Sequence, residues 1–205
     1  MDGLTIRKAT PGDTNRIAHL FGGDPGDEAI GIAGDAGRAR QFGMAMVRLP
    51  NSPQGWKRTV VAELSGQVVG IIQGGPDVPG VKATPRLVYV GLHVFGPIGL
   101  VRLLPRLRAR QRVQPVPPPN SYYVAEIDVD PAYRNAGVGG ALLDYAEVEA
   151  RSAGCRLMSL TTTTINPARR LYERHGFRVM ETRTDAAYKS YTGIEGRLLM
   201  VKELG

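Results

Sequence analysis

A glycine-rich turn at the mouth of a helix constrains this chain more than any other feature, in the segment VDPAYRNAGVGGALLDYAEVEA at residues 129–150. The first N–H groups of a helix have no partner within it and carry a partial positive charge. Gly137, Gly139 and Gly140 leave these groups open to an anion, and Arg134 adds a positive charge beside them. The segment therefore predicts a strand–loop–helix cradle for a pyrophosphate, although the glycines alone fit a plain turn equally well.

Hydrophobic periodicity on both sides of this segment predicts an α/β fold around one sheet. Thr10 and Asn166 are the expected N-caps of two helices, Gly154 and Gly176 are expected helix stops, and residues 65–66 predict a tight turn. We expect helices at residues 13–21, after a loop and toward residue 49, at 136–154 and at 166–176. We expect strands at residues 4–9, 57–64, 67–75, 121–129, 155–162, 177–184 and 196–204.

Composition indicates an ordinary globular protein. The chain has 205 residues, of which 42% are hydrophobic and 22% are charged, and this fits one domain over residues 1–205. A single cysteine, Cys155, excludes an intrachain disulfide, and the scattered histidines suggest no metal site. We find no uninterrupted apolar run of about 18 residues and no basic-then-apolar leader. We therefore predict a cytoplasmic protein without a membrane span and without a metal.

Two motifs together resemble the GNAT superfamily of acyl-CoA N-acyltransferases. Residues 129–143 follow the pattern V-x-P-x-x-R-x-x-G-x-G-x-x-L-L. Residues 166–177 follow the pattern N-x-x-A-x-x-L-Y-x-x-x-G-F, with one residue fewer between the asparagine and the Arg-Leu-Tyr group. The start of the chain, LTIRKATPGD, is also similar to the first strand and helix of that family. The resemblance implies a mixed, mostly antiparallel central sheet flanked by helices, with residues 76–119 inserted between the third and fourth strands.

The resemblance also implies acetyl-CoA as the co-substrate, an amine as the acceptor, and direct transfer within a ternary complex. Tyr172 is in the position that donates a proton to the leaving thiolate, and a phenol with a pKa of about 10 is protonated at neutral pH. The alternative for Tyr172 is a core aromatic. Asn166 is in the position that contacts the cofactor arm. The implied cofactor-binding residues are Ile127, Asp128, Val129, Arg134, Asn135, Ala136, Gly137, Val138, Gly139, Gly140, Asn166 and Tyr172.

The motifs do not assign the base that must accept the proton of the attacking amine. In the family an acid or histidine on the strand before the glycine loop often does so, at positions matching Tyr123 and Ala125, and Thr161 stands where some relatives carry glutamate. Glu126 is the nearest candidate base, yet regular alternation puts Glu126 and Asp128 on the opposite face of the strand. A bulge would reverse that phase. The alternative for Glu126 is a buried structural carboxylate.

The insertion at residues 76–119 concentrates the positive charge. Residues 96–119 hold five arginines and no acid, against a net charge of +7 for the whole chain. Leucines on one side and arginines on much of the rest predict a helix that Pro105 kinks or interrupts. It could cover the sheet edge or cleft, act as a lid or acceptor-binding element, or contact a membrane surface or nucleic acid. Because the basicity is local, no nucleic-acid partner is expected.

Two other classes of function are also compatible with the sequence. A non-catalytic acyl-CoA-binding or sensing module is credible because no base is assigned, and a regulatory surface protein acting through the arginines is a weaker option. Cys155 starts a predicted core strand, so we expect no covalent step through it. The sequence does not identify the acceptor amine, and a homodimer is the default expectation for symmetric assembly.

Overall fold

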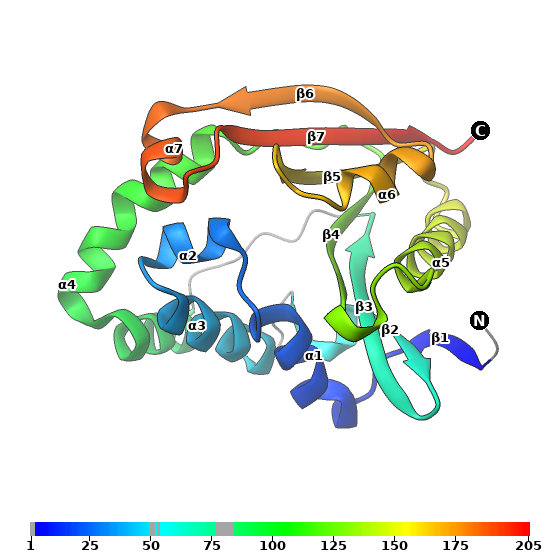
Figure 1. The fold of residues 1–205 in the computed structure, drawn as a ribbon, viewed down its shortest axis with the longest axis horizontal. Coiled ribbons are helices and arrows are strands. Elements are labelled where there is room, and N and C mark those ends of the chain that lie inside the picture. Colours follow the sequence, from blue (N-terminus) through cyan, green and yellow to red (C-terminus); the bar gives the residue numbers. More distant parts are fainter. Residues whose placement is uncertain (1–2, 50–51, 53, 77–83) are drawn as a thin grey trace.

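The computed structural model describes residues 3–49, 52, 54–76 and 84–205, which form a seven-stranded sheet in the order β1-β2-β3-β4-β5-β7-β6 (Figure 1). Neighbouring strands are antiparallel except β4 and β5, which run parallel. This is the mixed, mostly antiparallel sheet that the sequence predicts. The strands are β1 (Leu4–Lys8), β2 (Thr59–Leu64), β3 (Gln67–Gly75), β4 (Ser121–Val129), β5 (Leu157–Thr163), β6 (Arg178–Thr184) and β7 (Gly196–Glu203).

Helices fill the connections between the strands, and the longest one lies between β3 and β4, where the sequence predicts an insertion. The α-helices are α1 (Thr14–Gly22), α2 (Asp27–Ala33), α3 (Ala36–Arg48), α4 (Pro85–Arg112), α5 (Val138–Ser152), α6 (Arg169–Arg174) and α7 (Ala186–Thr192). Short 3₁₀ helices are η1 (Pro11–Asp13), η2 (Trp56–Arg58) and η3 (Pro131–Tyr133).

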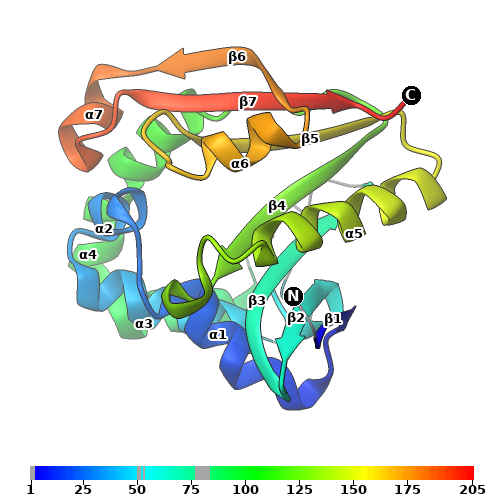
Figure 2. The same ribbon diagram turned by 45° about the vertical axis from the view of Figure 1, so that its right-hand side comes forward.

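The two faces of the sheet carry separate apolar cores. Leu142, Ala146 and Ala150 share one side of α5 at helical spacing, and all three are buried in the larger core between α5 and the sheet. Figure 2 shows α5 running alongside β4. On the opposite face, Ile17 of α1 and Val47 of α3 pack against β2 and β3 in a second core. The sheet is therefore covered on both sides around β3 and β4, which hold the candidate site.

A third, smaller core joins α4 to the end of the sheet that carries α7. Ala109 and Val113 of the insertion are buried with Tyr188 of α7 and with Ile194. In Figure 1 helices α2, α4 and α7 gather at the same side of the molecule, far from α5. The insertion is thus packed onto the domain along part of its length.

Most predicted strands are confirmed, with ends that move by at most two residues. Residues 65–66 form the predicted turn, and both have positive φ angles, as a type I′ turn requires. Two predictions are wrong in detail. The region expected as a loop and one helix holds two helices, α2 and α3, and α7 was not predicted. Asn166 is not the N-cap of α6, because that helix begins three residues later, at Arg169.

The kink in α4 also lies away from its predicted position at Pro105. Gly96 has φ 67° and ψ 173°, which are not helical, and the bend falls there, just before Pro97. Glycine adopts this backbone at little cost, and the following proline cannot donate the hydrogen bond that a continuous helix needs. Among the described residues α4 is the one helix long and apolar enough to cross a membrane. The apolar sequence of α4 is not uninterrupted, because Arg102 lies within its leucine-rich part.

Candidate functional site

The glycine-rich segment has the predicted strand–loop–helix form between β4 and α5. Gly137 is the N-cap of α5 with a left-handed φ of 83°, and Asn135 in the preceding loop has φ 60°. Within the described residues no side chain caps this helix, and residues 134–137 are exposed. The first N–H groups of a 15-residue helix therefore face solvent, where an anion can accept hydrogen bonds from them.

The next two glycines have a packing role as well. A Cβ atom at Gly139 would lie 2.9 Å from Cδ2 of Leu171, and one at Gly140 would lie 3.3 Å from the ring of His175. Leu171 lies in α6, and His175 is the C-cap of that helix. Because the two glycines have no side chains, the start of α5 can pack closely against α6. Gly137 and the unpaired N–H groups at the start of α5 are therefore the part suited to binding a phosphate group. Gly139 and Gly140 allow α5 to pack against α6.

Strands β4 and β5 separate in front of this cradle. They pair only from Ser121 to Val124 of β4, opposite Leu157 to Leu160 of β5, and then diverge (Figure 2). The backbone edge of residues 125–129 that faces β5 therefore has no strand beside it in the described chain. An extended ligand can add to such an edge through main-chain hydrogen bonds. This is the segment in which the sequence places the cofactor contacts Ile127, Asp128 and Val129.

A bulge in β4 decides which side chains face the opening. The pairing of β4 with β3 skips Ala125, because Val124 and Glu126 face consecutive residues of β3. Val124 and Ile127 both contact the core under α5, so the alternation reverses across the bulge. Glu126 and Asp128 therefore lie on the face away from α5. The bulge that the base assignment requires is present.

The two carboxyl groups of β4 titrate far from their ordinary range. Burial, followed by the nearby Asp128 carboxylate, raises the pKa of Glu126 well above its ordinary value. Burial also raises the pKa of Asp128 to about 7, against the opposing effect of the Arg134 guanidinium. Such a pair shares protons, and one member is held protonated while the other is available near neutral pH. Carboxyl groups whose pKa values are strongly shifted are typical of functional sites.

Tyr172 on α6 is buried, with 5% of its surface exposed. Burial, and then the Glu126 and Asp128 carboxylates, raise the pKa of its phenol above the ordinary value. Its ring packs edge-on against Phe177, 6.2 Å between centroids, which accounts for its core contacts. Its hydroxyl has no hydrogen-bond partner among the described residues, and this oxygen is not itself buried, so it can reach solvent or a bound molecule. Core packing alone thus explains the ring and leaves the hydroxyl without a role.

Two residues predicted to contact the cofactor, Asn166 and Arg134, make local hydrogen bonds within the chain. Asn166 donates from Nδ2 to the Thr162 hydroxyl at 2.7 Å and accepts at Oδ1 from the backbone N–H of Ala168 at 2.9 Å. One amide hydrogen of Asn166 is left for another acceptor. Arg134 donates from Nε to the carbonyl of Val129 at 3.1 Å, while its exposed guanidinium keeps further donors. Both residues shape the loops on either side of the opening.

A buried ion pair that the sequence did not reveal joins β7 to α2. Arg197 of β7 pairs with Glu28 of α2, and Tyr188 of α7 donates to the same carboxylate at 2.9 Å. Burial, the largest effect, acts to raise the pKa of Glu28, but Arg197, Arg110 and the hydrogen bond from Tyr188 together leave that pKa below its ordinary value. Arg197 also donates to the Thr161 hydroxyl at 3.1 Å. One signal could have identified it: an arginine within the apolar strand GRLLMV.

Comparison with protein families gives one match. A family model described as the acetyltransferase (GNAT) family matches residues 40–177, which is more than half of the chain. No curated protein sequence matches significantly.

Solved acetyltransferase structures have a similar fold over nearly the whole chain. A crystal structure of an acetyltransferase is 25% identical, with a TM-score of 0.58, and the match covers 98% of this chain and 100% of that one. A GCN5-related N-acetyltransferase from Kribbella flavida is 22% identical, with a TM-score of 0.59 and 98% of each chain covered. The PaiA N-acetyltransferase from Thermoplasma acidophilum, in complex with coenzyme A, is 14% identical, with a TM-score of 0.55 and 98% of each chain covered. The last two likenesses concern the fold alone.

Proposed function

Since this chain belongs to the GNAT acetyltransferase family, we propose that it transfers an acetyl group from acetyl-CoA to an amine, directly within a ternary complex. The single observation that supports this best is the divergence of β4 from β5 after Val124, with three features on the elements around it. These are the uncapped N-terminus of α5, the bulge-reversed carboxyl pair of β4, and the unpartnered hydroxyl of Tyr172.

We assign binding of the co-substrate to the α5 end of the opening. The N–H groups at the start of α5 and the guanidinium of Arg134 would hold the pyrophosphate, and the free edge of residues 127–129 would hold the pantetheine arm. When bound, acetyl-CoA supplies an acyl group that is activated as a thioester. The protein orients that group between β4 and α6.

We assign the proton transfers to the carboxyl pair and the phenol. Asp128 accepts the proton that the amine loses as its nitrogen bonds to the acyl carbon, because a base with a pKa of about 7 suits neutral pH. Glu126, whose pKa burial raises well above its ordinary value, keeps its proton. Tyr172 donates its hydroxyl proton to the sulfur as the carbon–sulfur bond breaks. Asp128 rather than Glu126 is therefore the proposed base, within the same pair.

A covalent route through the cysteine has no support. Cys155 precedes β5 at the end where β4 and β5 are paired, and it packs beside the larger core. The opening lies at the other end of these strands, where they diverge. Cys155→Ala is expected to retain activity.

A non-catalytic acyl-CoA sensor is the second candidate, and one observation favours it. Tyr123 and Ala125 match positions where relatives often carry a base, Thr161 stands where some carry glutamate, and none of the three is an acid. A sensor would bind the same thioester at the α5 end and would need neither Asp128 nor Tyr172 to exchange protons.

Tyr172→Phe tests the proposal against the core-aromatic alternative, because it removes one hydroxyl and little volume. General acids contribute about 100- to 10,000-fold to rate. We expect the lower end for kcat, since the raised pKa of Tyr172 makes it a weak donor, with unchanged acetyl-CoA affinity and thermal midpoint. Phe177→Leu, which disturbs the neighbouring ring, is the control for packing and should lower the thermal midpoint. Wild-type kcat in Tyr172→Phe would contradict the assignment.

A further inference from the structure

Helix α4 exposes an unusual amount of apolar side chain. Among the described residues, twelve large hydrophobic side chains are exposed, and seven of them belong to this one helix. Single exposed apolar residues are normal on a protein surface, whereas many of them on one helix are typical of an interaction surface. We call these residues the apolar face of α4: Val88, Tyr89, Leu92, Ile98, Val101, Leu104 and Leu107.

The opposite side of α4 is firmly packed, so this exposure does not come from a detached helix. Gly91, Phe95 and Ala109 are buried, and the ring of Phe95 lies 5.4 Å from that of Phe42 on α3. Near its end, Arg112 forms a paired contact with Asp185 at 2.7 Å and 3.0 Å. The helix is therefore held against the domain by one side and presents the apolar face outward.

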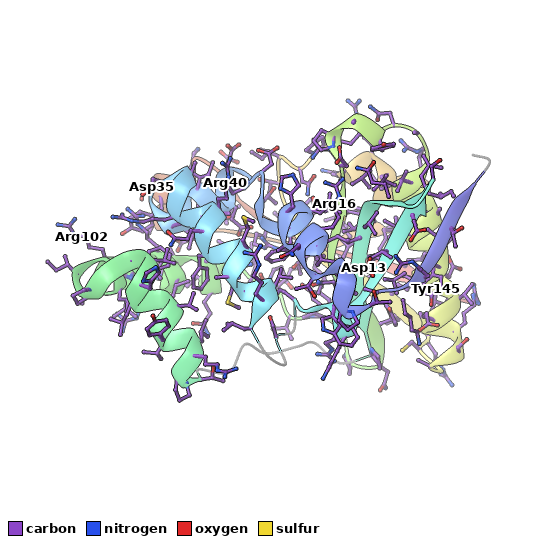
Figure 3. All side chains as sticks on the ribbon, turned by 90° about the horizontal axis from the view of Figure 1, so that it is seen from below. Asp13, Arg16, Asp35, Arg40, Arg102 and Tyr145 are labelled. Atoms are coloured by element: carbon purple, nitrogen blue, oxygen red, sulfur yellow. The ribbon has the colours of Figure 1, made fainter. Side chains whose placement is uncertain are left out.

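The charge of α4 is entirely positive. It contains six arginines and no acidic residue in 28 positions. Arg102 and Arg108 are exposed beside the apolar face, and neither has an ion-pair partner among the described residues. Figure 3 shows Arg102 projecting from the outer edge of the molecule, away from the sheet. The surface thus combines apolar area with cations, which complements a partner that is both apolar and anionic.

A hollow of about 260 Å³ lies at the bend of α4, next to Ile98 of the apolar face. Its lining includes three arginines, Arg38, Arg102 and Arg106, of which Arg38 also pairs with Asp35 at 3.4 Å. Arg106 is held in place by the ring of Tyr191, 5.5 Å from its centroid. Arginines converging on a hollow are suited to a phosphate group, because the planar guanidinium matches its oxygens.

Two other occupants fit the observations less well. A membrane-spanning helix needs about 20 continuous residues, but the break at Gly96 leaves arms of 11 and 16 residues, at 85–95 and 97–112. A second copy of this chain on a symmetric interface would bring the same arginines together, and like charges repel. An anionic lipid surface satisfies both the apolar face and the arginines.

We propose that α4 docks this protein on the surface of a membrane rich in anionic phospholipids. The apolar face enters the boundary between head groups and acyl chains, and the hollow at the bend receives a lipid phosphate. The helix lies in the plane of the membrane and does not cross it. This docking is independent of the transfer reaction, since α4 supplies none of the residues assigned to it.

Flotation of the full chain with vesicles tests the proposal. We expect binding to vesicles of phosphatidylglycerol and phosphatidylcholine, at least tenfold weaker binding to pure phosphatidylcholine, and release by high salt or alkaline carbonate. Ile98→Ser combined with Val101→Ser should weaken binding at least tenfold. Val148→Ser, at an equally exposed valine of α5, is the matched control and should bind like wild type.

The charge contribution is tested by Arg102→Glu, with Arg178→Glu on the exposed surface of β6 as its control for the same change in net charge. Only Arg102→Glu should lose the preference for anionic vesicles. The proposal would be overturned if wild type did not bind vesicles, bound neutral vesicles equally well, or resisted extraction by carbonate. It would also be overturned if the serine variants bound vesicles like wild type and altered only the dimerisation of the protein. Thermal midpoints within about 2 °C of wild type establish that the variants are folded.

Discussion

The hydroxyl groups of Tyr123 on β4 and Thr161 on β5 lie 2.8 Å apart and form a hydrogen bond between the two strands. Gln114 and Arg197 also donate to the Thr161 hydroxyl, at 3.1 Å each. The resemblance to the family places a frequent base position at Tyr123 and, in some relatives, a glutamate at Thr161. Here both hydroxyls are engaged in a hydrogen-bond network that joins the strands where they begin to diverge, and the proposed proton acceptor is instead one of the β4 carboxyl groups.

Asp128→Asn should lower kcat/KM by about 100-fold or more at a pH above 7, because the amine then loses its proton acceptor. In wild type the rate should rise with pH through about 7, the pKa to which burial raises Asp128. The variant should lose this rise. Steady-state rates across pH, with Glu203→Gln at an exposed carboxyl as the control, provide the measurement. An identical pH profile in Asp128→Asn would move the base elsewhere.

The same carboxyl group should make stability depend on pH in an unusual direction. Asp128 has a pKa of about 7 in the folded chain and about 3.9 when unfolded. Between these values the folded state holds more protons, so this group makes the free energy of unfolding fall as pH rises. Urea unfolding should show Asp128→Asn gaining stability over wild type from about pH 4 to about pH 7, then no further gain. A gain independent of pH would rule out the raised pKa.

Gly137→Val should weaken acetyl-CoA binding at least tenfold, which is about 1.4 kcal/mol. The left-handed N-cap would move and a side chain would enter the anion cradle at the start of α5. Gly154→Val is the matched control, because Gly154 is also exposed with a left-handed φ, of 72°, but lies past the other end of that helix. Calorimetric titration of both folded variants with acetyl-CoA measures the two affinities. Equal affinity in the two variants would mean that the loop does not hold the pyrophosphate.

The sequence was informative wherever local rules decide structure. The strand and turn patterns, the glycine loop before α5 and the stop at Gly176 are local, and all are confirmed. The pairing of Arg197 with Glu28 joins residues 169 positions apart, and no periodicity reveals it. The bulge at Ala125 depends on the register between β4 and β3, which the sequence does not reveal. The sequence could predict only that a bulge would move Glu126 and Asp128 to the other face of the strand. The bend of α4 fell at Gly96 because glycine reaches backbone angles that a helix excludes, whereas Pro105 fits within the second arm.

The most direct test of the account is turnover of acetyl-CoA by the full chain across a panel of amines, with free thiol and acylated amine measured together. We predict that at least one amine is acylated in step with thiol release, and that Tyr172→Phe slows both about 100-fold. Binding of acetyl-CoA that depends on Gly137, with no amine acylated at any pH, would contradict catalysis and support the sensor.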